Sequence, residues 1–136
     1  PAVDVRIMRG ALEGTLPPDF EKLPSLGVER AELDSEVEAI RVDDSILSYV
    51  SRVLTMTRNH PQLVIGASVR GGLAIARAAR VLAALAGRDF VIPDDVKKLA
   101  LPVLRHRIHI SPEAQMGGET PEKILGEILK KAEFPT

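Results

Sequence analysis

The stretch that decides the fold is GASVRGGLAIARAARVLAALAGRDFV, residues 66–91. It predicts a helix that starts at Ser68, whose side chain can cap the first turn, and runs to about Ala86, where Gly87 supplies the stop. The apolar positions of this helix form one stripe rich in small residues, namely Ile75, Ala79, Leu82, Ala83 and Ala86. Such a stripe lets a neighbouring helix approach closely, so we expect packed helices.

Three arginines occupy the opposite side of the same helix. Arg70, Arg77 and Arg80 fall within roughly 80° of one another at 100° per residue. Arg70 lies two residues after Ser68, where a cation opposes the helix dipole at a cost of roughly 0.3–1 kcal/mol. The same position suits a phosphate, because free N–H groups and a guanidinium then face one anion. Spacing alone favours a solvated surface residue over this phosphate contact.

Further helices are predicted on both sides of this one from apolar periodicity and capping residues. They cover residues 3–12, 29–38 and 44–58, and two more begin at Pro93 and Thr120. Pro102 is expected to kink or restart the helix that begins at Pro93. The residues expected to face inward include Ile46, Val50, Val53, Leu54, Thr57, Val96, Leu99, Ala100, Val103, Ile124, Leu125, Ile128 and Leu129.

Short extended runs are expected at residues 39–42, 88–91 and 107–110, and a loop is expected at residues 111–118. The fold class is therefore mainly α, a small helical bundle with two or three very short strands. Scarce aromatic residues, 3% of the chain, agree with a core of Leu, Ile, Val and Ala.

Composition narrows the possible functions of the 136 residues. With 45% hydrophobic and 27% charged residues, the chain is typical of one globular domain, and a formal charge of −1 argues against a dedicated nucleic-acid binder. The absence of cysteine excludes disulfides and thiolate metal sites. No apolar run approaches a membrane span, so no membrane partner is expected. Because the first residue is Pro1 and no signal segment follows, we expect a piece of a longer cytoplasmic protein.

No catalytic constellation stands out in the sequence. A phosphate-binding Gly-x-x-x-x-Gly-Lys-Ser/Thr loop and paired magnesium-binding acids are both missing. Asp94 and Asp95 are explained by a helix-dipole role, which makes a metal unnecessary. His106 in its basic turn is read as a half-exposed histidine in preference to a phosphate or proton site. We therefore expect no metal ligands in this chain.

Several of these segments, in order, resemble the lid of MoxR-type AAA+ ATPases, which is related to the lid of the magnesium-chelatase ATPase subunit. The segments are Val42–Asp44, Gly66–Arg70, Ala78–Arg80, Ala83–Val91, Pro93–Val96 and Pro102–Arg107. The resemblance is weaker over residues 1–38 and strong over 39–136, being closest from Ile40 to Pro112. It implies that residues 1–136 form a single C-terminal lid domain, and that the ATP-binding core is absent from this chain.

The resemblance also implies a role for the start of the central helix. In that family this segment carries the sensor 2 arginine, which matches Arg70, so Arg70 becomes the expected catalytic residue and Ser68 with Arg70 the expected nucleotide contacts. The chain departs from the family at Val69, where Pro is usual, and at Gly71-Gly72, where Ala is common. These changes are expected to loosen the helix start. Ile92 replaces a common Thr cap at a cost of about 1 kcal/mol.

For the full-length protein the resemblance implies ATP and Mg²⁺ as cofactors, its own AAA+ core as the lid's partner, and a ring-forming homo-oligomer. It further implies a chaperone-like motor that matures other proteins, with a possible partner containing a von Willebrand factor A domain. The lid alone should bind no cofactor and hydrolyse nothing. The alternative is a free-standing helical DNA- or protein-binding module, for which the face of Arg70, Arg77 and Arg80 is the supporting feature.

Overall fold

The computed structural model describes residues 30–134. Contacts divide the chain into two units, Pro1–Glu32 and Leu33–Thr136, and the fold described below is that of the second unit. The helix predicted over residues 3–12 lies outside the described residues. Within residues 30–134, no helix is long and apolar enough to cross a membrane.

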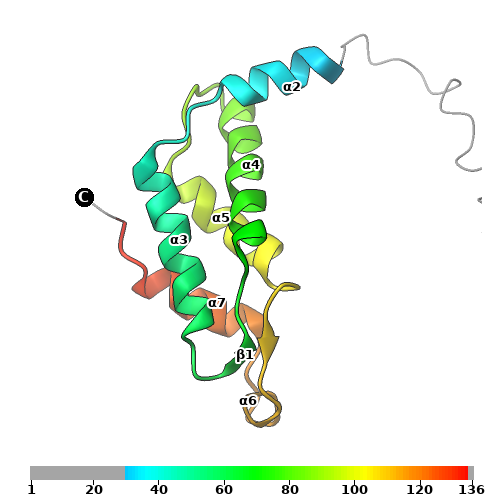
Figure 1. The fold of residues 1–136 in the computed structure, drawn as a ribbon, viewed down its shortest axis with the longest axis vertical. Coiled ribbons are helices and arrows are strands. Elements are labelled where there is room, and N and C mark those ends of the chain that lie inside the picture. The colour runs from blue at the N-terminus through cyan, green and yellow to red at the C-terminus, as the bar shows by residue number, and fades with distance from the viewer. Residues whose placement is uncertain (1–29, 135–136) are drawn as a thin grey trace, which may run out of the picture. The chain divides into compact units, whose positions relative to one another are not determined.

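Helices dominate the described part of the chain, as Figure 1 shows. In chain order the elements are α2 (Arg30–Ala39), α3 (Asp44–Arg58), β1 (Leu63–Ile65), α4 (Val69–Leu85), α5 (Pro93–Leu104), β2 (His109–Ile110), α6 (Pro112–Met116) and α7 (Pro121–Lys131). α4 packs against α3 and α5, and α7 packs against the same two helices. The predicted fold class, a mainly α bundle with very short strands, is confirmed.

The core between α3 and α4 follows the predicted periodicity. All five residues expected to face inward from α3 are buried, and so is Tyr49, which the sequence analysis did not single out. From α4, Ile75, Ala79 and Ala83 are fully buried, whereas Leu82 is half-buried and Ala86 is exposed. The apolar stripe is therefore shorter than predicted, because the helix ends at Leu85 and Ala86 already belongs to its C-terminal cap.

The start of α4 is more tightly packed than the sequence suggested. Gly71 and Gly72 were expected to loosen the helix, yet both are buried. A Cβ on Gly71 would lie 2.9 Å from Leu104 Cδ2 of α5, and one on Gly72 would lie 2.8 Å from Leu54 Cδ1 of α3. The glycine pair thus brings the first turn of α4 close to two neighbouring helices.

The other end of α4 contains a buried ion pair. Gly87, at φ +69°, ends the helix in the left-handed region, as predicted. Arg88 then donates from Nη1 and Nη2 to the two carboxylate oxygens of Asp95, both at 2.9 Å. Asp95 also accepts from the N–H of Ile92, the N-cap residue of α5, at 3.0 Å, and Ile92 itself has no side-chain acceptor for the first turn.

Asp94 and Asp95 both lie in the first turn of α5, as the helix-dipole interpretation requires, but Asp95 has a further role, because it is buried and bound to Arg88. Asp94 is exposed, with Lys97 at 3.7 Å. Pro102 does not restart α5, which continues as one helix to Leu104.

The strands are few and short. β1 and β2 pair antiparallel, with Leu63 opposite Ile110 and Ile65 opposite His109. The extended runs predicted at residues 39–42 and 88–91 meet in a parallel bridge between Arg41 and Phe90. β1 itself was not predicted, because a strand of three residues is too short to show a periodicity in the sequence.

The prediction of a loop at residues 111–118 is wrong, because α6 covers most of this stretch. Ser111 Oγ accepts from the Ala114 N–H at 3.2 Å, and Pro112 fills the first helical position. The same combination at Thr120 and Pro121 starts α7 as predicted. In α7, Ile124, Leu125 and Ile128 are buried and Leu129 is half-buried.

Candidate functional site

The first turn of α4 presents an exposed arginine at a helix N-terminus. Ser68 is the N-cap residue, with φ −84° and ψ 167°, and its carbonyl accepts from the Gly71 N–H at 2.9 Å. Ser68, Val69 and Arg70 are all exposed. The first N–H groups of a helix have no intrahelical acceptor, so they and the positive end of the dipole face outward here.

Within the described residues, neither of the two predicted nucleotide contacts, Ser68 and Arg70, is bound to another side chain. The Ser68 hydroxyl makes no capping hydrogen bond. Within residues 30–134, the Arg70 guanidinium has no hydrogen bond or ion pair. Both side chains are therefore available to an anion outside this unit.

The segment before Arg70 is fixed to the last turn of α3. The Thr57 hydroxyl donates to the Leu54 carbonyl at 2.6 Å and accepts from the Ala67 N–H at 2.9 Å. Arg58 Nε donates to the Ala67 carbonyl at 2.9 Å. Ala67 is fully buried, and its N–H and its carbonyl each find a hydrogen-bond partner in adjacent residues of α3.

Gly66 completes this attachment by close approach. A Cβ at Gly66 would lie 2.5 Å from both Cα and N of Arg58, which is backbone and cannot turn aside. Only glycine fits at this point. The contact explains why the family-like segment begins with Gly66, two residues before the N-cap Ser68.

Two more arginines lie around the first turn of α4. The Arg107 side chain follows α5, and its Cδ is 3.6 Å from where a Cβ on Gly71 would stand. Arg58 reaches Ala67 from α3. Arg58, Arg70 and Arg107 thus come from three helices or their ends, and all three are exposed. Sequence reasoning missed that Arg58 lies beside Ala67 and Arg107 beside Gly71, because only the packing of α3 and α5 on α4 brings them there.

Comparison with known proteins places this arrangement in a family. A family model described as an AAA lid domain matches residues 55–128, which include the last turn of α3, all of α4 and most of α7. The chain belongs to the AAA lid domain family.

Curated relatives of this lid domain include a protein named MoxR1. Uncharacterized protein YeaC of Bacillus subtilis (strain 168) is 42% identical over 103 residues, 76% of the lid chain and 32% of that protein. Chaperone MoxR1 of Mycobacterium tuberculosis is 34% identical over 131 residues, 90% of the lid chain and 34% of that protein. The predicted resemblance to a MoxR-type AAA+ lid is confirmed.

A solved structure supports the same fold. The crystal structure of a protein from Cytophaga hutchinsonii assigned as an ATPase superposes with a TM-score of 0.74 and 27% identity. The match covers 77% of the lid chain and 34% of that chain. The lid chain thus spans about a third of the length of the proteins that it matches.

The other two arginines of the predicted basic face have different surroundings in the lid. Arg77 is exposed and Arg80 half-buried. Both line a shallow pocket together with the carboxylates Asp34 and Glu38 of α2. The face along α4 is therefore of mixed charge beyond its first turn, and Arg70 stands apart from Arg77 and Arg80.

The remaining titratable groups of residues 30–134 do not gather into a metal-binding cluster. His106 is exposed, in place of the half-exposed histidine that was expected. Among residues 30–134, no three His, Cys, Asp or Glu side chains are grouped so that they could hold a metal ion.

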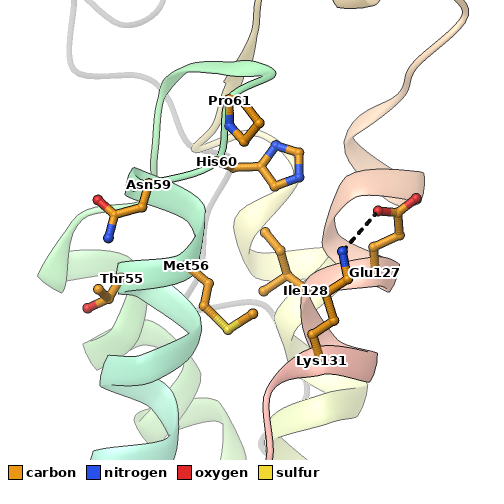
Figure 2. Close-up of a pocket in the computed structure, with 8 residues that line it drawn as sticks. All are labelled: Thr55, Met56, Asn59, His60, Pro61, Glu127, Ile128 and Lys131. Atoms are coloured by element: carbon orange, nitrogen blue, oxygen red, sulfur yellow. Dashed lines mark ion pairs between the residues drawn. The ribbon is translucent and has the colours of Figure 1, made fainter.

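Figure 2 shows a pocket of the lid between the end of α3 and α7. Met56 and Ile128 supply apolar surface, and Glu127 and Lys131 form an ion pair at 3.9 Å. His60 Nδ1 accepts from the Gln62 N–H at 3.3 Å. With a volume of about 260 Å³ the pocket is smaller than typical cofactor sites, and neither Ser68 nor Arg70 lines it.

Proposed function

We propose that this lid domain supplies the sensor 2 arginine, Arg70, to an ATP site that the AAA+ core of the same full-length protein completes. The observation that carries the proposal is the exposed guanidinium of Arg70 in the first turn of α4, which has no hydrogen bond or ion pair within residues 30–134. This turn lies in the segment matched by the family model. An unpaired cation at the positive end of a helix is unfavourable until an anion joins it.

The residues at the start of α4 fit a phosphate and do not fit a magnesium ion. Ser68 and Arg70 offer a hydroxyl, a guanidinium and the free N–H groups of the first turn, which are all donors to an anion. Magnesium prefers carboxylate and water oxygens, and the described residues offer no acidic cluster for it. In the full-length protein we assign the phosphate contact to the lid and Mg²⁺ to the core.

The whole protein, on this proposal, is an ATP-hydrolysing motor that works as a homo-oligomeric ring in the cytoplasm. The relation to chaperone MoxR1 supports a chaperone-like role in maturing other proteins. A partner with a von Willebrand factor A domain stays a prediction from the resemblance. The lid by itself has no phosphate-binding loop and should not hydrolyse ATP.

The Arg70→Ala variant of the full-length protein tests the assignment. If Arg70 reaches the terminal phosphates when the lid closes, its loss should lower kcat roughly 10- to 1,000-fold, the scale of one preorganised charge contact. Arg77→Ala is the matched control, because it removes the same charge two turns along α4 and should change kcat less than about threefold. Equal rates for wild type and Arg70→Ala would refute the assignment.

The alternative, a nucleic-acid-binding module, makes a different prediction. Arg77 and Arg80 lie near carboxylates, so few phosphates could be neutralised on this face. Binding to duplex DNA at about 150 mM salt should therefore be undetectable by fluorescence anisotropy. A submicromolar, sequence-specific complex would favour the alternative.

A further inference from the structure

We infer that Thr57 is a positioning residue for Arg70, acting through hydrogen bonds that fix the segment before α4 to the end of α3. The inference rests on the proposed role of Arg70 and names a residue that does not itself touch the nucleotide. It is carried by the contacts of Thr57 and Arg58 with Gly66 and Ala67, the two residues that precede Ser68.

The hydroxyl of Thr57 is held in one orientation. It is fully buried and donates its proton to the Leu54 carbonyl at 2.6 Å, within its own helix. A hydroxyl has one donor and two acceptor lone pairs, so the donor is spent and a lone pair remains for the Ala67 N–H at 2.9 Å. Because Thr is β-branched, few χ1 rotamers compete with this one. The position of the Ala67 N–H is therefore sharply defined.

The second backbone group of Ala67 is fixed from the next residue of α3. Arg58 Nε donates to the Ala67 carbonyl at 2.9 Å, although the Arg58 side chain is otherwise exposed. Gly66 presses directly against the Arg58 backbone, where a Cβ would be 2.5 Å from two of its atoms. Three contacts thus fix residues 66–67 to one turn of α3.

Among residues 30–134, no hydrogen bond or ion pair fixes the Arg70 side chain on the outer side of this turn. The side chains of Ser68, Val69 and Arg70 are exposed, and Val69 keeps 72% of its surface in solvent. Within the same residues, the contacts that fix the first turn of α4 lie on its inner side, in the Ala67 attachment and in the packing of Gly71 and Gly72. If residue 57 served only to fill the core, an apolar side chain of the same shape would be enough. The Thr57 hydroxyl therefore serves to fix residues 66–67 to α3.

A double-mutant cycle in the full-length protein tests the inference, with Thr57→Val and Arg70→Ala made singly and together. Thr57→Val keeps the shape and removes the hydroxyl. It should lower kcat roughly 3- to 30-fold with little change in the KM for ATP, because a small displacement of Arg70 weakens a contact made in the closed state. Thr57→Ser restores the hydroxyl and should recover kcat to within about twofold of wild type.

The combined variant separates positioning from stability. If Thr57 acts through Arg70, adding Thr57→Val to Arg70→Ala should lower kcat by less than about twofold further. An equal loss in both backgrounds, or a wild-type kcat for Thr57→Val, would overturn the inference. A wild-type kcat for Arg70→Ala would instead overturn the proposed function, whatever Thr57→Val does.

Arg58→Met provides the same test if Thr57→Val does not fold, as judged by circular dichroism. It removes the donor to the Ala67 carbonyl from an exposed side chain and leaves the buried hydroxyl in place. Its loss of kcat should likewise disappear in the Arg70→Ala background. An unchanged kcat, or a loss that persists in that background, overturns the inference.

Discussion

The two ends of α4 carry arginines in opposite situations. At its start, Arg70 is exposed and has no acidic partner within the described residues. Just after its end, Arg88 is bound through both Nη atoms to Asp95, whose side chain is only 3% exposed. Removing one partner of such a pair would leave the other charge uncompensated and destabilise the fold, whereas a cation left unpaired at the positive end of a helix dipole costs stability unless an anion binds. The proposed role of Arg70 rests on this difference.

The pKa of Asp95 reflects its pairing. Burial by itself raises this pKa, but the hydrogen bonds from Arg88 and from the Ile92 N–H, together with the charges of Arg88 and Lys98, lower it below its ordinary value. The carboxylate is therefore the stable form in the folded state.

The largest effect on stability is expected at this ion pair. Asp95→Asn removes the charge that Arg88 binds and should lower the free energy of unfolding of the chain by roughly 2–4 kcal/mol, because a partly buried guanidinium loses its partner. Urea unfolding followed by circular dichroism measures it. Asp94→Asn is the control, since its ion pair is exposed and should be worth less than about 0.5 kcal/mol. Similar losses in both variants would show that the Arg88–Asp95 pair matters no more to stability than an exposed ion pair.

At the other end, the attachment of α4 to α3 should be sensitive to a single methyl group. Gly66→Ala places a Cβ against the Arg58 backbone, so either the turn or the end of α3 must move. The expected loss is roughly 1–3 kcal/mol in the free energy of unfolding. Gly126→Ala is matched to it, because nothing lies within 4 Å of that Cβ in α7. This control should be neutral or stabilising by up to about 1 kcal/mol, and equal losses would show that the close approach is unimportant.

Lowering the pH should reduce the contribution of the Arg88–Asp95 ion pair to the free energy of unfolding. The folded-state pKa of Asp95 is depressed, so its contribution to stability is present above the unfolded pKa of about 3.9 and is lost as the pH falls through the folded value. The stability difference between wild type and Asp95→Asn should therefore be constant from about pH 8 to pH 5 and shrink below about pH 4. Chemical denaturation at several pH values measures it, and a difference that stays constant in acid would contradict the pairing.

The smallest effect is expected at Arg70 itself. Arg70→Ala removes an unfavourable cation from the helix N-terminus and should raise the free energy of unfolding of the chain by a few tenths of a kcal/mol. Arg77→Ala, further from the helix end, should change it less. Thermal unfolding of both variants checks this, and a clear loss of stability in Arg70→Ala would make Arg70 a structural residue.

The sequence predicted the local features of this fold well because they depend on neighbouring residues. Periodicity and caps define α3, α4 and α7, and Gly87 marks the end of α4 from its residue type alone. The position of Arg70 in the first turn follows from Ser68, although its phosphate role came from the resemblance and stays a prediction.

The features that the sequence could not supply depend on contacts between distant residues. Thr57 shows inward spacing, but its bond to Ala67 crosses ten residues and arises from the turn around β1. Gly71 and Gly72 look like weak points of a helix until Leu104 and Leu54 are seen against them. Asp95 looks like an ordinary residue of a first turn, because nothing in the pattern reveals its pairing with Arg88.

The most direct test of the central claim is a structure of the full-length protein with a non-hydrolysable ATP analogue and Mg²⁺. The Arg70 guanidinium should lie about 3 Å from an oxygen of the terminal phosphates, within charge-assisted hydrogen-bond distance, while Arg88 stays on Asp95. A closed, nucleotide-bound site in which Arg70 still faces solvent and contacts no phosphate would contradict the account.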